Sequence, residues 1–328
     1  MTDAHLGRAT IGSLEHGKPA GMRPFDDITR LERAQSLDRP AAVIRTIVQK
    51  VLRDQRVKDV LHGVWLGHPL HPALAAITAG SFISATMLDA VGKPVGGGRA
   101  PSSFLIASGL ALTPPTVAAG WADWSESHED QQRVGLVHAS ANVLSVALYA
   151  AALVQRLRGT GSGRLLSIAA GGASGFGAML GGHMGYRQAL GANHAEEVPH
   201  IGPAEWQSLG AVAEVPVGKP VRRIAGDVAV MVVRRRDATD AGSPHGAAGL
   251  SVLADRCPHL AAPLHEGDLV EVDGDEHIIC PWHGSEFRVS DGCLVHGPAT
   301  APVPRFEARV VGGELQARVV PIPGVPAS

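Results

Sequence analysis

The spacing of apolar positions divides the chain into a helical half and a β-rich half. Residues 1–40 are rich in Gly, Pro and charge, and we expect them to form an irregular N-terminal tail. Over residues 41–61 apolar side chains recur at helical spacing, and a basic set occupies much of the opposite face. That set is Arg45, Lys50, Arg53, Arg56 and Lys58. Such an amphipathic helix is typical of a membrane surface, although a soluble packing helix has the same pattern.

Four uncharged stretches follow, each close to the roughly 20 residues that a helix needs to cross a bilayer. Their ranges are 72–88, 101–122, 134–155 and 165–186. They are rich in Ala, Gly and Ser, and small residues let helices approach one another closely in lipid. We therefore predict a domain over residues 41–190, made of the amphipathic helix and four transmembrane helices. A soluble, Ala-rich helical bundle is the alternative.

A polar linker over residues 191–209 leads to a region of a different pattern. Short β-type runs such as "VAVMVVRR", "GLSVLA" and "LQARVV" replace the long apolar stretches. The turn pairs Asp273-Gly274 and Asp291-Gly292 separate some of these runs. Residues 210–320 are therefore predicted to form a compact all-β domain. The expected fold class is multi-domain: a four-helix transmembrane bundle followed by an all-β domain.

Charge and cysteine content exclude several classes of protein. The 29 Lys and Arg residues nearly balance the 31 Asp and Glu residues, so we expect no nucleic-acid partner. The three cysteines, Cys257, Cys280 and Cys293, are too few for a disulfide-stapled secreted scaffold and suit a reducing compartment. Residues 1–40 contain no apolar run of the kind that a secretory signal has, so export is not expected.

Two Cys–His pairs lie in the predicted β domain. Cys257 and His259 have one residue between them, Cys280 and His283 have two, and twenty residues separate the pairs. Two thiolates and two imidazoles on neighbouring loops bind metal in one of two ways. One is a Cys₂His₂ zinc site, and the other is a [2Fe–2S] centre in which two Cys hold one iron and two His hold the other.

The residues around these pairs resemble the Rieske family. The matching segments are "CPHLAAPLHEGDL", "CPWHGSEFRVSDG" and "HGPA". The resemblance implies a [2Fe–2S] cluster, with Cys257 and Cys280 on one iron and His259 and His283 on the other. It also implies that the Gly297-Pro298 loop covers the cluster.

Departures from the family pattern indicate the type of cluster. High-potential Rieske proteins of cytochrome bc complexes have one more cysteine in each loop, and these positions are Ala262 and Trp282 here. A tyrosine that donates to a cysteine sulfur in those proteins corresponds to Phe287, while Ser285 is retained. Losing a hydrogen bond to sulfur lowers the potential, so the resemblance implies a ferredoxin-type centre. Cys293, outside the motif, is expected to be a small buried residue. A Rieske oxygenase is not expected, because about thirty residues follow the Gly-Pro loop and leave no room for a mononuclear iron domain.

Histidines also lie at the ends of the apolar stretches. If the chain crosses the bilayer at each stretch, then His68, His71, His138, His183 and the β domain all lie on one side of it. Ionisable residues in membrane segments are candidates for function. We predict that at least two of these four histidines bind one redox centre, for which b-type haem is the first choice. A metal ion, a quinone pocket, or a purely structural role at the helix ends are the alternatives.

Residues of about 60–190 resemble a family of small prokaryotic four-helix membrane proteins whose function is not established. The resemblance depends on "HGVWLGHPLHP", Asp89, "GWADW", "RVGLVHASANV" and "GGHMGY", and it implies topology more than activity. Basic residues on the two sides are balanced, and Arg45 and Lys50 favour a cytoplasmic β domain slightly. The predicted location is therefore the cell membrane, crossed several times, with the β domain in the cytoplasm.

Together these features predict a membrane-anchored electron carrier or oxidoreductase component rather than a stand-alone catalyst. Its cluster would pass electrons between a soluble redox partner and a haem or quinone in the membrane. The alternative is a membrane-tethered redox sensor or binding protein, in which the cluster reports oxidation without carrying electron flux.

Overall fold

The computed structural model describes residues 23–91, 100–235, 247 and 249–323. Within these residues a helical half precedes a β half, as predicted. The helices are α1 (Arg23–Glu32), α2 (Asp38–Val51), α3 (Gln55–His62), α4 (Leu70–Val91), α5 (Ala100–Ser125), α6 (Glu129–Leu157), α7 (Arg164–Gly182) and α8 (Val198–Ile201). A π-helical turn, His183–Arg187, extends α7.

The prediction of an irregular tail is wrong for residues 23–40, because α1 and the start of α2 are helical. Ile28 of α1 is buried in a cluster with residues of α6 and α7. Arg133 of α6 binds the Asp38 carboxylate at 2.6 Å and the backbone carbonyl of Glu32 at 2.7 Å. These contacts stabilise helices in a segment whose composition indicated an irregular tail. The rest of the predicted tail, residues 1–22, lies outside the described residues.

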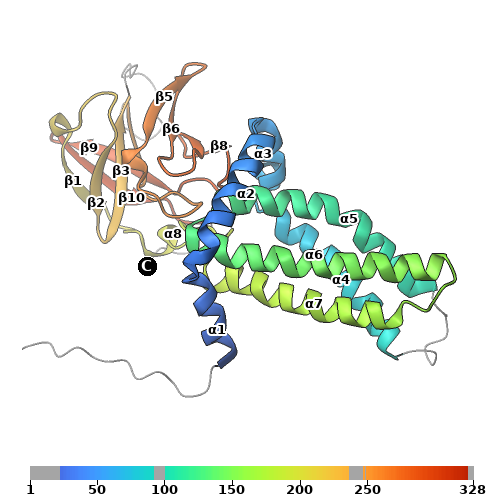
Figure 1. Ribbon diagram of the computed structural model, residues 1–328. Helices are drawn as coiled ribbons and strands as arrows, with labels where there is room; N and C mark the ends of the chain where they lie inside the picture. Colours follow the sequence, from blue (N-terminus) through green and yellow to red (C-terminus); the bar gives the residue numbers. More distant parts are fainter. Residues whose placement is uncertain (1–22, 92–99, 236–246, 248, 324–328) are drawn as a thin grey trace, which may run out of the picture.

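The single amphipathic helix predicted over residues 41–61 is two helices, α2 and α3. Leu52 leaves the helical conformation, and the Asp54 side chain caps α3 by accepting from the amides of Arg56 and Val57. The break lets α3 take a direction of its own at the end of the bundle (Figure 1).

Helices α4 to α7 lie side by side as a bundle (Figure 1). All four are long and apolar enough to cross a membrane, counting the π-helical turn with α7. Glycines allow close packing: a Cβ on Gly109 would lie 2.5 Å from the Phe82 ring. Large apolar side chains such as Phe104 and Val143 face outward, as expected of a surface that contacts lipid. At the end far from the β domain, Arg156 binds the Asp89 carboxylate at 2.5 Å.

The β half contains two antiparallel sheets. Sheet order is β1-β10-β9-β4-β3-β2 in the larger sheet and β5-β6-β7-β8 in the smaller one. The strands of the larger sheet are β1 (Gln207–Ala211), β2 (Val221–Ala225), β3 (Val228–Arg234), β4 (Leu250–Ala254), β9 (Arg305–Val311) and β10 (Glu314–Val319). Those of the smaller are β5 (Asp268–Val272), β6 (Asp275–Ile279), β7 (Glu286–Arg288) and β8 (Leu294–His296). Asp273 and Gly274, both at positive φ, form the predicted turn between β5 and β6.

The predicted linker connects the two halves closely. It contains α8, and the His194 amide donates to the Pro258 carbonyl at 2.9 Å. Glu197 binds Arg256 at 2.8 Å. The β half therefore lies against one end of the bundle, next to α2 and α3 (Figure 1).

Candidate metal centre

The two Cys–His pairs occupy two loops with the same backbone design. The Cys257 amide donates to the Ala262 carbonyl at 2.8 Å, and the Ala261 amide donates back to the Cys257 carbonyl at 2.9 Å. In the second loop the Cys280 amide donates to the Ser285 carbonyl at 2.8 Å, and the Gly284 amide donates to the Cys280 carbonyl at 3.1 Å. The fifth residue of each loop, Ala261 or Gly284, has a positive φ. Each loop thus turns back on its cysteine in the same way.

The two cysteines are buried side by side in the core between the sheets. A hydrogen bond with Cys257 lowers the pKa of Cys280 to about 7, and the same bond raises the pKa of Cys257. Backbone amides of Trp282 and His283 donate to the Cys280 sulfur, and those of His259 and Leu260 donate to the Cys257 sulfur. Amide donors around paired sulfurs stabilise negative charge, as thiolate ligands of a metal require.

The two histidines lie next to each other on the outer side of the cysteines. The rings of His259 and His283 stand edge to face, with centroids 4.9 Å apart. Nδ1 of His259 is buried and has no hydrogen-bond partner. Burial also lowers the pKa of His259 well below its ordinary value, so the imidazole is neutral. A buried nitrogen without a partner is costly, and a metal ion would satisfy it.

A third loop closes the site. Its amide at Ala299 donates to the Ser285 hydroxyl at 2.9 Å, which joins it to the second Cys–His loop. Pro298 and Ala299 line a small cavity together with His259. The Gly297-Pro298 segment therefore lies beside the four metal-binding candidates, as the resemblance implies. These residues fit a cluster bound by two sulfurs and two imidazoles.

Comparison with known proteins gives the same assignment. Residues 205–307 match the family model "Rieske [2Fe-2S] domain". Over 116 residues the chain is 32% identical to the anthranilate 1,2-dioxygenase ferredoxin subunit of Burkholderia cepacia, covering 35% of this chain and 94% of that protein. The chain belongs to the Rieske [2Fe–2S] family. The resemblance seen in the sequence is confirmed, and the zinc alternative is set aside.

Two further similarities cover smaller shares of the chain or are weaker in structure. Over 90 residues the chain is 33% identical to the oxygenase component of dicamba O-demethylase from Stenotrophomonas maltophilia, of which it spans 22%. The ferredoxin of carbazole 1,9a-dioxygenase from Nocardioides aromaticivorans is similar over 36% of this chain and 100% of that chain, at 24% identity and a TM-score of 0.29. Residues 67–194 match the family model "Predicted membrane protein (DUF2231)". The fusion of a membrane domain to a Rieske domain is thereby confirmed.

Ala262, Trp282 and Phe287 are the residues that distinguish this chain from high-potential Rieske proteins, and they differ in burial. Ala262 and Phe287 are buried in the core beside the cysteines, whereas the Trp282 side chain is about half exposed. Cys293 is exposed, so the expectation that it is buried is wrong. It lies in the turn between β7 and β8, where its amide donates to Asp291 at 2.9 Å.

Within the described part of the chain, no group of three or more His, Cys, Asp or Glu side chains surrounds one metal position. A Rieske centre does not require one, since each iron takes two protein ligands.

The structure separates the four membrane histidines. His68 is exposed and contacts the carbonyl of Pro69, and His183 pairs with Glu32 of α1 at 2.7 Å. His71 and His138 lie within the bundle, and their Nδ1 atoms donate to the carbonyls of Thr116 and Gly177 at 2.9 and 2.8 Å. His68 and His183 thus have partners outside the bundle interior, and the prediction that at least two of the four bind one centre depends on the other two. His71 and His138 continue as candidates.

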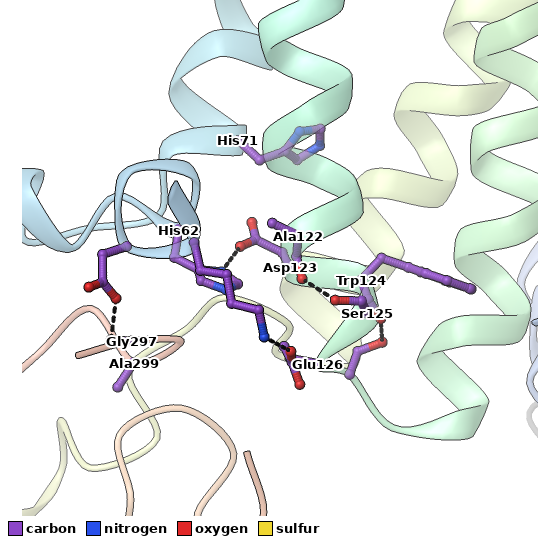
Figure 2. Close-up of polar contacts among 12 residues, drawn as sticks. His62, His71, Ala122, Asp123, Trp124, Ser125, Glu126, Gly297 and Ala299 are labelled. Carbon is purple, nitrogen blue, oxygen red and sulfur yellow. Dashed lines mark hydrogen bonds and ion pairs between the residues drawn. The ribbon is translucent and has the colours of Figure 1, made fainter. Parts of the chain in front are cut away.

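The structure also reveals functional candidates that sequence reasoning missed. His62, at the end of α3, is buried, and its Nδ1 lies 2.8 Å from the Asp123 carboxylate of α5 (Figure 2). Both residues line the cavity that His259 also lines. The ring of His128, which precedes α6, lies 5.9 Å from that of His283 and 5.5 Å from that of Trp282. The side of the Rieske site formed by His259 and His283, the histidine edge, thus faces the end of the membrane domain. His62 opens the segment "HGVWLGHPLHP", but its burial depends on the separate helix α3.

Proposed function

We propose that this chain is a membrane-anchored electron carrier. Its [2Fe–2S] cluster is held by Cys257 and Cys280 on one iron and by His259 and His283 on the other, and it exchanges electrons with a soluble partner and with a haem or quinone at the membrane. When bound, the cluster takes up and releases one electron at a time. The observation that carries the proposal is the direction of the histidine edge, which faces the bundle through His128.

The residues around the site affect which redox state of the cluster is favoured and on which side electrons are exchanged. Four backbone amides donate to the two cysteine sulfurs and favour the more negatively charged, reduced state. Phe287 offers no hydroxyl to the sulfurs, and this favours the oxidised state relative to a tyrosine. The buried cysteines exclude water from one side of the cluster, so electron exchange takes place at the histidine side.

The membrane acceptor we favour is b-type haem held by His71 and His138. Each histidine donates its Nδ1 proton to a backbone carbonyl, and this bond fixes the tautomer that leaves Nε2 as a ligand atom. Glycines face both rings: Gly120 lies against His71 and Gly181 against His138. Nε2 of His138 has Asn142 as a neighbour at 3.2 Å, which a ligated iron would have to displace.

A quinone is the alternative acceptor. The cavity between His259 and the His62–Asp123 pair has a volume of about 20 Å³. Such a volume accommodates water rather than a ring compound, so a quinone headgroup would need the two domains to separate. The soluble partner is a protein that resembles those of dioxygenase ferredoxins, since such a ferredoxin subunit is a relative.

Electron flux distinguishes this function from a redox sensor. The purified chain is reconstituted in liposomes and reduced with dithionite, excess dithionite is removed, and a short-chain ubiquinone or menaquinone analogue is then added. Our proposal predicts rapid reoxidation of the cluster, together with the haem where haem is bound. A cluster that stays reduced with every acceptor is what the sensor alternative predicts.

The predicted cytoplasmic position of the Rieske domain has a direct test. Cys293 is exposed, while Cys257 and Cys280 are buried, so a membrane-impermeant maleimide reports the location of Cys293. It should label Cys293 in inside-out vesicles and spare it in spheroplasts. Labelling in spheroplasts would place the domain outside. The Cys293→Ser variant is the control for specificity.

A further inference from the structure

A single carboxylate of the membrane domain holds the loop that covers the cluster. The Asp59 side chain of α3 uses both oxygens: Oδ2 lies 2.7 Å from Nδ1 of His296, and Oδ1 accepts from the Gly297 amide at 3.0 Å. The Asp59 side chain is 17% exposed. A charged acceptor in a partly buried contact makes stronger hydrogen bonds than a neutral one. Asp59 thus joins α3 to the end of β8 and the Gly-Pro loop.

Asp59 is itself fixed with respect to the bundle. Gln55, one turn earlier, donates to the Asp59 carboxylate at 2.9 Å. Lys58 binds Glu126 at 3.0 Å, and His62 binds Asp123 at 2.8 Å. These two contacts attach α3 to the end of α5 and to the turn that follows it (Figure 2).

The surfaces on both sides of this contact fit closely. A Cβ added to Gly297 would lie 2.9 Å from Val64 and 3.6 Å from the Cβ of His62. A side chain at position 297 would therefore push the Rieske domain away from the membrane domain. On the other side of the site, the ring of His128 meets the rings of Trp282 and His283. The contacts through Asp59 and His128 flank the histidine edge.

We propose that Asp59 is a positioning residue for electron transfer: it seats the histidine edge of the cluster on the end of the membrane domain. This inference rests on the proposed function and adds how the two domains are held for the transfer. The contact lies beside the histidine edge and keeps this edge toward the end of the membrane domain. Asp59 therefore selects the membrane domain as the partner of the cluster in the resting orientation.

Two measurements on the full chain test the role of Asp59. In membranes dried as oriented multilayers, the EPR spectrum of the reduced cluster should change with the angle to the field in the wild type, because the domain is held in one orientation. In Asp59→Ala that angular dependence should flatten, while the spectrum of unoriented membranes stays unchanged. Hydrogen exchange at the Gly297 amide should become at least about tenfold faster, because a charge-assisted bond is lost.

Controls come from both sides of the contact. Arg56→Ala, an exposed position on the same helix, should behave as the wild type. His296→Ala removes the Oδ2 contact from the Rieske side and leaves the Gly297 amide bonded to Oδ1. It should flatten the angular dependence as Asp59→Ala does, even if Asp59→Ala fails to fold. Wild-type angular dependence in both contact variants, together with wild-type Gly297 exchange in Asp59→Ala, would overturn the proposal. A wild type without any Rieske signal would instead overturn the proposed function, so the two failures are distinguishable.

Discussion

The rings of His259 and His283 stand edge to face, with an interplanar angle of 89° and centroids 4.9 Å apart. They come from two loops that share one pattern of backbone hydrogen bonds, and each loop also buries one cysteine. The chain thus presents two sulfurs on the core side and two imidazoles on the side of the membrane domain.

The first prediction concerns the cysteines. Cys257→Ser or Cys280→Ser should lose the cluster, because a hydroxyl does not replace a thiolate in a buried site. Iron content should fall from about two per chain to background, with loss of the visible spectrum. Cys293→Ser is the matched control and should keep both, since Cys293 is exposed and outside the loops. Retention of full iron by Cys280→Ser would show that the ligands are misassigned.

The second prediction concerns the midpoint potential. Without the loop disulfide and the tyrosine donor, the potential should fall in the lower half of the roughly −150 to +300 mV range of Rieske centres. Phe287→Tyr should raise it, because the ring is packed in the same core as both cysteines and a hydroxyl that donates to a sulfur raises the potential. Redox titration followed by EPR measures both values. A wild-type potential in the upper half would contradict the ferredoxin-type assignment.

The sequence predicted the Rieske domain, and the structure brings its four candidate ligands together because they are close in sequence and lie on two loops of the same design. Cys257 and His259 share one loop, so their relation depends on local backbone geometry alone. The contacts of the membrane histidines were harder to predict, since they depend on how the helices rotate against each other. His183 is paired with Glu32, and Glu32 belongs to α1, which composition alone did not indicate. Asp59 and His62 were missed for a related reason. Asp59 contacts Gly297 and His62 contacts Asp123, and both contacts join positions far apart in sequence.

The third prediction concerns the membrane. The chain should sediment with membranes and require detergent for extraction, because α4 to α7 are long, apolar and expose large apolar side chains. Fractionation with high salt and with carbonate checks this. Release by either treatment would support the soluble-bundle alternative.

The fourth prediction concerns haem. If the chain binds b-type haem, His71→Ala and His138→Ala should each reduce the pyridine haemochrome signal to background and leave the Rieske spectrum intact. His68→Ala is the control and should keep the haem, because His68 is exposed and contacts the carbonyl of Pro69. No haem in the wild type, together with a normal Rieske signal, would reject the haem version.

The central claim is that Cys257, His259, Cys280 and His283 hold a [2Fe–2S] cluster. EPR spectroscopy of the purified, dithionite-reduced chain, together with metal analysis, tests it most directly. The account predicts a rhombic Rieske signal and about two iron atoms per chain. Zinc in place of iron, or iron without the rhombic signal, would contradict it.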